Sequence, residues 1–137
     1  MRFMMLMIPK GYENAAPGTT PDPKAVAAMM KYNKALLQGG VLLALDGLHP
    51  PSEGARISFK GGTPAVADGP FTEGKEVIGG YWMIQVKSKE EAIEWAKRCP
   101  ANATDTIELR EVYEFSEFPA EVQEAAGFAD LASKPGT

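Results

Sequence analysis

Residues that commonly act in catalysis or bind metals are scarce in this chain of 137 residues, which has one cysteine, Cys99, and one histidine, His49. A single cysteine excludes an intrachain disulfide and a thiolate metal cluster. Cys99 lies just before Pro100, at the end of a predicted helix, where the pKa of a thiol is raised, so a reactive thiolate is not expected. With one histidine and no dinucleotide fingerprint of glycines, we expect neither a metal site nor a cofactor.

Positive charge and long apolar runs are also scarce. The chain has 14 Lys and Arg residues against 18 Asp and Glu, which gives a net charge of −4. Nucleic-acid-binding domains are normally basic, with their charges clustered, so nucleic acid is not expected as a partner. No segment approaches the roughly 20 apolar residues of a membrane-spanning helix, since the apolar run from Met1 to Ile8 ends at Pro9. We therefore predict a cytoplasmic protein with no membrane partner.

The spacing of the apolar residues predicts an α+β domain. The predicted strands are Arg2–Ile8, Val41–Leu45, 55–59, Thr63–Val66, Tyr81–Val86 and Thr106–Tyr113. The predicted helices are Pro23–Gln38, a helix between Ser88 and Pro100, and Pro119–Ala132. This order is a variation on the ferredoxin-like layout, with an antiparallel sheet and helices on one face. The other face would be uncovered, so we expect a homodimer.

Two of these helices have residues at their ends that typically start or stop a helix. Thr20 or Asp22 is expected to cap the first helix, and Gly39-Gly40 is expected to end it. Ser88 and Glu91 form a capping-box pattern at the start of the second.

His49 is the candidate general acid or base, because it is the only imidazole in the chain. It lies in the loop that follows a buried strand, where a side chain can be held rigidly, and Pro50 restricts its backbone. A carboxylate could orient its ring for proton transfer. The alternative is an exposed or hydrogen-bonded loop histidine without a catalytic role.

Two carboxylates are candidate partners for His49. Asp68 precedes Gly69-Pro70, a combination that an Asx-turn alone would explain. If Asp68 instead faces His49 across the same edge of the sheet, the two would form a catalytic pair. Asp46 could take the same place, and spacing alone does not separate the two.

Tyr81 is the aromatic residue best placed to present a hydroxyl to a ligand. It enters a strand directly after Gly79-Gly80, where a backbone or a ligand can approach closely, although such glycines also mark bulges. Lys75 could contact a polar or anionic ligand. The substrate-binding candidates are therefore Tyr81, Asp46 and Lys75, beside the catalytic candidates His49 and Asp68.

Several motifs together give the chain a family resemblance. They are the opening apolar strand, Gly47-Leu48-His49-Pro50-Pro51, Asp68-Gly69-Pro70-Phe71, the run from Lys75-Glu76 through Gly79-Gly80-Tyr81, and Glu91-Ala92-Ile93-Glu94-Trp95-Ala96. From Met1 to about Tyr113 the chain resembles the DGPF-domain proteins of the YCII-related superfamily. The resemblance implies a dimeric ferredoxin-like α+β barrel. We expect such a domain at residues 1–115, with residues 116–137 as its C-terminal helical extension and tail.

The resemblance implies two kinds of function. Some members of the superfamily are lyase-type enzymes, among them dehydrochlorinases with a proposed His–Asp site. In those relatives the histidine lies on the first helix, which has none here. The first hypothesis is cofactor-free acid–base chemistry on a small polar organic acid. The alternative is a non-catalytic dimeric ligand-binding or regulatory module, associated with extracytoplasmic-function sigma factors. Whether the chain is an enzyme stays open at this point.

Overall fold

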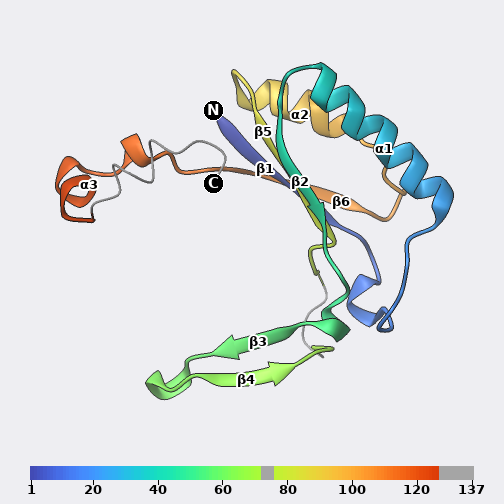
Figure 1. The fold of residues 1–137 in the computed structure, drawn as a ribbon, viewed down its shortest axis with the longest axis horizontal. Coiled ribbons are helices and arrows are strands. Elements are labelled where there is room, and N and C mark those ends of the chain that lie inside the picture. Colours follow the sequence, from blue (N-terminus) through green and yellow to red (C-terminus); the bar gives the residue numbers. More distant parts are fainter. Residues whose placement is uncertain (72–75, 127–137) are drawn as a thin grey trace.

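The computed structural model describes residues 1–71 and 76–126 (Figure 1). Its strands are β1 (Arg2–Ile8), β2 (Leu42–Gly47), β3 (Ala55–Ser58), β4 (Ala65–Asp68), β5 (Gly80–Gln85) and β6 (Thr106–Glu111). Its helices are α1 (Pro23–Gln38), α2 (Lys89–Lys97) and α3 (Ala120–Ala126). Short 3-10 turns are η1 (Tyr12–Asn14), η2 (Pro51–Glu53), η3 (Lys60–Gly62) and η4 (Phe115–Glu117).

The main sheet has four antiparallel strands in the order β2-β5-β1-β6. Helices α1 and α2 cover one of its faces, and no helix of the described residues lies on the other (Figure 1). The predicted α+β class, with an antiparallel sheet and helices, is confirmed. Within the described residues, the sheet of one chain stays open and does not close into a barrel.

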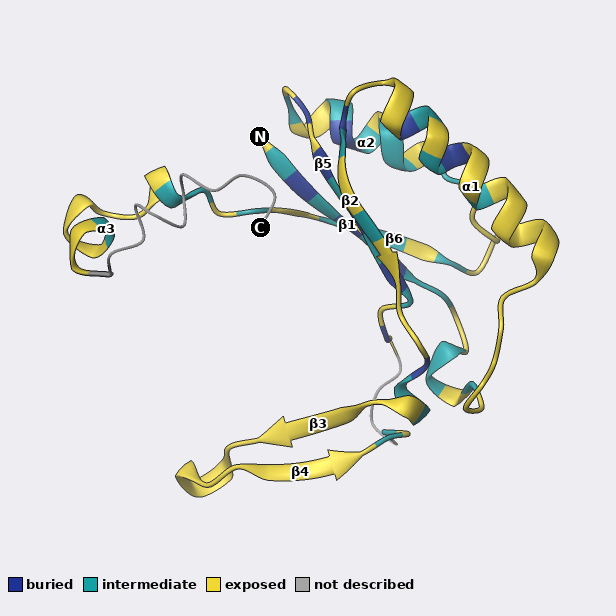
Figure 2. Cartoon of the chain, in the orientation of Figure 1, coloured by how far each residue is buried: buried dark blue, intermediate teal, exposed yellow. Residues whose placement is uncertain are grey.

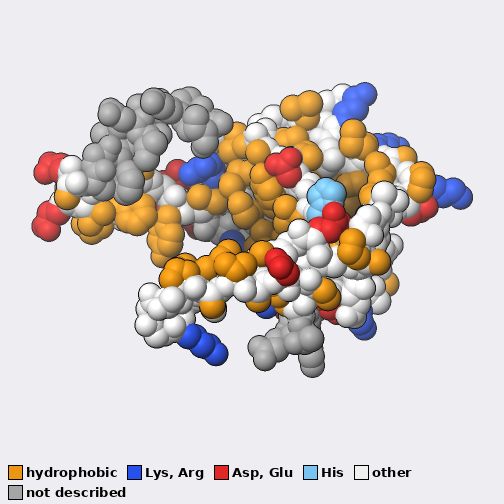
Figure 3. Space-filling model, turned by 60° about the horizontal axis from the view of Figure 1, so that its bottom comes forward, with side chains coloured by type: hydrophobic (Ala, Val, Ile, Leu, Met, Phe, Trp, Pro, Cys, Tyr) orange, Lys and Arg blue, Asp and Glu red, His pale blue; other side chains and the backbone are white. Residues whose placement is uncertain are grey.

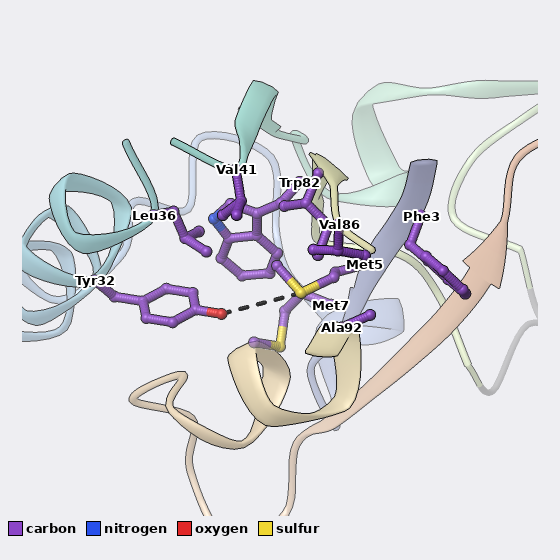
Figure 4. Close-up of a cluster of buried hydrophobic side chains, with 10 residues drawn as sticks. Phe3, Met5, Met7, Tyr32, Leu36, Val41, Trp82, Val86 and Ala92 are labelled. Atoms are coloured by element: carbon purple, nitrogen blue, oxygen red, sulfur yellow. Dashed lines mark hydrogen bonds between the residues drawn. The ribbon is translucent and has the colours of Figure 1, made fainter. Parts of the chain in front are cut away.

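The core lies between the sheet and the two helices. Along β1, Phe3, Met5 and Met7 are buried, whereas the residues between them are only half-buried. Successive side chains of a strand point to opposite faces, so this alternation identifies the face toward the helices. Helix α1 contributes Tyr32 and Leu36 to the same cluster (Figure 4).

A polar contact ties the two helices together inside this layer. The hydroxyl of Tyr32 donates a hydrogen bond to the carbonyl oxygen of Trp95 at 2.7 Å and lies 4.0 Å from the sulfur of Met5. Burial raises the pKa of this phenol, which therefore stays protonated as a donor. Helix α1 and helix α2 are thus joined directly as well as through the sheet.

Local signals account for the helix ends. Of the two cap candidates, Asp22 is the cap: its carboxylate accepts a hydrogen bond from the backbone N–H of Ala25 at 3.3 Å. Gly40, with φ of 72°, follows the end of α1 in a conformation that glycine adopts without strain. Ser88 caps α2 as predicted, accepting from the N–H of Glu91 at 3.1 Å.

The β3–β4 hairpin differs from its prediction in two respects. Its second strand is Ala65–Asp68 rather than Thr63–Val66, because Pro64 has no N–H to donate to the ladder and the strand begins after it. Asp68 is therefore the last residue of β4 and not part of the loop beyond it. The hairpin also forms a sheet of its own, in which every residue of both strands is exposed (Figure 2).

The chain beyond β6 leads away from the sheet. Strand β6 ends at Glu111, short of the predicted Tyr113, although the N–H of Val112 still donates to the carbonyl oxygen of Arg2. The Arg2 guanidinium then pairs with Glu114 at 2.7 Å, which lowers the pKa of that carboxyl. Helix α3 begins at Ala120, close to the prediction, and residues 127–132 of the predicted helix lie outside the described residues.

Two segments thus project from the sheet, and we call them the hairpin arm (residues 55–68) and the C-terminal arm (residues 112–126). Figure 1 shows both on the side of the sheet opposite the helices. They leave from opposite ends of β1. The C-terminal arm starts beside Arg2, whereas the loop that follows the hairpin arm pairs with the other end, through the N–H of Gly79 and the carbonyl oxygen of Met7.

Candidate functional site

A pair of polar side chains lies on the uncovered face, where β2 ends and β5 begins. Asp46 and Tyr81 are directly opposite each other in the register of these strands. The Tyr81 hydroxyl donates a hydrogen bond to the Asp46 carboxylate at 2.7 Å. This bond raises the pKa of Tyr81, because a neighbouring negative charge opposes the loss of the phenolic proton. Both residues are candidates from the sequence, but their spacing does not predict that they meet.

Two glycines at the start of β5 allow neighbouring segments to pack closely against it. A Cβ on Gly80 would lie 3.0 Å from the carbonyl oxygen of Asp46, and a Cβ on Gly79 would lie 2.7 Å from the ring of Pro9. The predicted close approach of a backbone is seen at Gly80, whereas Gly79 meets the side chain of Pro9. The N–H of Leu48 also donates to the carbonyl oxygen of Gly79, which extends the pairing beyond the end of β2.

His49 follows three residues after Asp46, and its carboxylate neighbour is Glu53. The ring Nδ1 lies 3.2 Å from Glu53 Oε2, and 82% of the His49 side chain is exposed. The same Glu53 oxygen accepts from the backbone N–H of Gly18 at 3.2 Å. The Gly18 bond first, and the His49 contact second, lower the pKa of Glu53, so this carboxylate is charged at neutral pH.

The turn that carries His49 is fixed from several sides. Pro50 is fully buried directly after it. The Tyr12 hydroxyl of η1 donates to the carbonyl oxygen of Leu48, and the Ser52 hydroxyl of η2 donates to that of Ala15 at 2.9 Å. The backbone at His49 is therefore held between η1 and η2, although its ring is open to solvent. We call Asp46, Tyr81, His49 and Glu53 together the sheet-end site (Figure 3 shows the single histidine in pale blue, beside acidic side chains).

The Asp68-Gly69-Pro70-Phe71 motif packs against this same turn. A Cβ on Gly69 would lie 1.7 Å from the carbonyl oxygen of Pro51, so only glycine fits there. The N–H of Gly69 donates to the carbonyl oxygen of Gly54 at 3.0 Å. Phe71 receives the guanidinium of Arg56 over its ring at 4.3 Å. The motif therefore anchors the base of the hairpin arm to η2.

The structure separates some of the candidates that the sequence grouped. Asp68 pairs with Ala55 in the hairpin register, and no hydrogen bond among the described residues joins His49 to Asp68 or to Asp46. The Asx-turn bond proposed for Asp68 is also not among the hydrogen bonds of the described residues. Lys75 lies outside the described ranges. Glu53 was missed, although its position four residues after His49 was a readable signal.

Metal ligation and membrane insertion find no support in the described part of the chain. No group of three or more His, Cys, Asp or Glu side chains in residues 1–71 and 76–126 is arranged to hold a metal ion. None of the helices in these ranges has the length and apolar character that a membrane crossing requires.

Comparison with known proteins identifies the family of this chain. The model of the YCII-related domain matches residues 1–116. The chain belongs to the YCII-related family. It is also similar to an uncharacterized protein of Rhizobium meliloti (strain 1021), with 28% identity over 76 residues, which cover 56% of this chain and 61% of the relative. The family resemblance seen in the sequence is thereby confirmed, and the match covers β1 to β6 with both faces of the sheet.

Proposed function

We propose that this YCII-related protein is a homodimer that binds a small polar ligand at the sheet-end site. The observation that carries the proposal is the hydrogen bond from Tyr81 to Asp46 on the face that the helices leave bare. Around this pair the same face presents the half-buried apolar side chains of Met4, Leu6 and Met83. An apolar surface with a few convergent polar groups is the usual composition of a ligand site.

The polar groups of the site favour a ligand that donates hydrogen bonds. Tyr81 gives its proton to Asp46, so its oxygen is left as an acceptor. The carboxylates of Asp46 and Glu53 are acceptors as well. A hydroxyl or ammonium group suits these partners better than the organic acid that the resemblance implies, since like charges repel.

The uncovered face of the sheet supports the homodimer, because a second copy would cover its half-buried apolar side chains Met4, Leu6 and Met83. The strand order β2-β5-β1-β6 also agrees with the ferredoxin-like layout, in which a second copy facing the open sheet would complete a dimeric α+β barrel.

Two measurements test this proposal. Light scattering should give twice the chain mass of 14.7 kDa, and a monomer at high protein concentration would refute the homodimer. Ethanolamine, which carries both a hydroxyl and an ammonium, should shift the backbone NMR signals of Gly80 and Tyr81, whereas acetate should not. Asp46→Asn should abolish the ethanolamine shifts, and Glu90→Gln, on helix α2 over the other face of the sheet, should leave them unchanged. Shifts with acetate alone would contradict the ligand class.

Acid–base catalysis at the same site is a second candidate, favoured by the contact between His49 and Glu53. A carboxylate on Nδ1 holds that nitrogen protonated and leaves Nε2 as the base. Nitrogen NMR should therefore find the Nδ1–H tautomer of the neutral ring. Glu53→Gln should shift the tautomer balance, and Asp68→Asn should not. The opposite result would restore the pair predicted from the sequence. A link to extracytoplasmic-function sigma factors stays a prediction.

A further inference from the structure

The hairpin arm presents an apolar face that none of the described residues of its own chain covers. Ile57 and Val66 are directly opposite in the register and therefore lie on one face of the hairpin. They are 51% and 70% exposed, and Phe59 at the end of the arm is 67% exposed. A two-stranded hairpin alone is only marginally stable in water. This face therefore needs a partner.

The C-terminal arm presents a second apolar surface. Tyr113 is 76% exposed, and its ring lies 5.9 Å from that of Phe118. Phe118 and Val122 are also exposed. Large apolar side chains gathered on a projecting segment mark an interaction surface rather than ordinary scattered exposure.

The two arms carry opposite charge. Within residues 55–68 the charged side chains are Arg56, Lys60 and Asp68, an excess of one positive charge. Residues 112–126 contain no Lys or Arg, and their charged residues are Glu114, Glu117, Glu121 and Glu124. The acidic arm is thus the complement of the basic one in charge, and both carry apolar side chains.

The positions of the arms prevent this pairing within one chain but allow it between two. The arms leave the sheet at opposite ends of β1 and project on the same side (Figure 1). Consider a second copy that faces the open sheet and is related to the first by a twofold axis perpendicular to the strands. The end of one sheet that carries the hairpin arm then lies over the end of the other sheet that carries the C-terminal arm. Each hairpin arm then lies where the partner's C-terminal arm projects, so the contact forms twice, as an isologous interface requires.

We propose that the hairpin arm of one copy packs on the C-terminal arm of a second copy of this chain. This inference rests on the homodimer proposed above and adds which surfaces meet in it. The contact joins Ile57, Phe59 and Val66 to the apolar residues of the other arm, with Lys60 near the glutamates of α3.

Cross-linking tests the pairing directly. In a Cys99→Ala background, a protein with Phe59→Cys is mixed with a protein with Val122→Cys and treated with a short bis-maleimide. The mixture should give a covalent heterodimer in high yield, and each protein alone should give little product. Efficient cross-linking of the Phe59→Cys protein with itself, or no product in a mixture that is dimeric by light scattering, would overturn the pairing and leave the homodimer standing. A monomeric wild type would overturn both.

A charge exchange gives an independent test. Lys60→Glu and Glu121→Lys should each raise the dimer dissociation constant by about two- to five-fold, as expected for exposed ion pairs. The double variant should return to the wild-type value, because it exchanges the charges across the contact. Lys24→Glu, on the exposed side of α1, is the matched control and should have no effect. Additive weakening in the double variant would contradict the contact.

Discussion

The two faces of the main sheet differ in what covers them and in what they carry. The face toward the helices holds Met5, Leu36 and Ile84, all fully buried, and no buried polar or charged residue is found in the described part of the chain. The opposite face holds the bonded pair Asp46 and Tyr81 and is flanked by two exposed arms. Stability thus comes mainly from the covered face, whereas the bare face is where we propose that a ligand and a second copy bind.

The largest effect should come from the covered face. Leu36→Ala removes a side chain with 0% exposure and should lower the free energy of unfolding by about 2–5 kcal/mol. Leu37→Ala, the next residue of α1 and 64% exposed, is the matched control and should change it by less than about 0.5 kcal/mol. Urea unfolding measures both. Equal losses would mean that a partner buries Leu37, so this pair of variants also probes the assembly.

The next effect concerns the base of the hairpin arm. Gly69→Ala places a Cβ against the carbonyl oxygen of Pro51, which must shift, so we expect a loss of about 1–3 kcal/mol in urea unfolding. Gly47→Ala adds the same methyl group where nothing lies within 4 Å and should be close to neutral. If Gly69→Ala is equally neutral, the motif does not hold the arm to η2.

A smaller effect is expected at the bare face. The hydrogen bond to Asp46 raises the pKa of Tyr81, so Asp46→Asn should bring it back toward the ordinary value. A raised pKa in the folded state gives stability at low and neutral pH that is lost as pH rises through the raised value. Carbon NMR of labelled tyrosine follows the titration. An unchanged Tyr81 curve in Asp46→Asn would show that the pair is not formed in solution.

The smallest effect concerns Cys99, at the edge of the covered face. Burial, and then the charge of Asp105, raise the pKa of its thiol to about 11, in the direction predicted from its place at a helix end but mainly through burial. A disulfide reagent at pH 8 should therefore react far more slowly with the folded protein than with the unfolded one. Equal rates would place the thiol in solvent.

The covered face could be predicted closely from the sequence. Strand β1 and helix α1 match their predicted bounds, because the apolar run, the Asp22 cap and the glycines after Gln38 all act locally. The α+β arrangement follows from the same signals, since each element must bury its apolar side.

The bare face could be predicted only in part. Asp46 and Tyr81 are 35 residues apart, and only the register of β2 and β5 brings them together. The partner of His49 was sought in Asp68 and Asp46, whereas the short turn η2 brings Glu53 to it. No local sequence signal indicates that the hairpin forms a sheet of its own, because alternating apolar and polar residues predict a strand without saying which strand it pairs with.

The close packing of Gly69 on Pro51 has a further consequence, because it joins the hairpin arm to the turn of the proposed ligand site. The turn that holds His49 and Glu53 is also the base of the segment that we expect to reach the second copy. If both proposals hold and ligand binding shifts this turn, ligand occupancy and assembly are thermodynamically linked, and each would change the other by the same factor. Dilution of the protein would then weaken ligand binding. Added ligand would in turn stabilise the dimer.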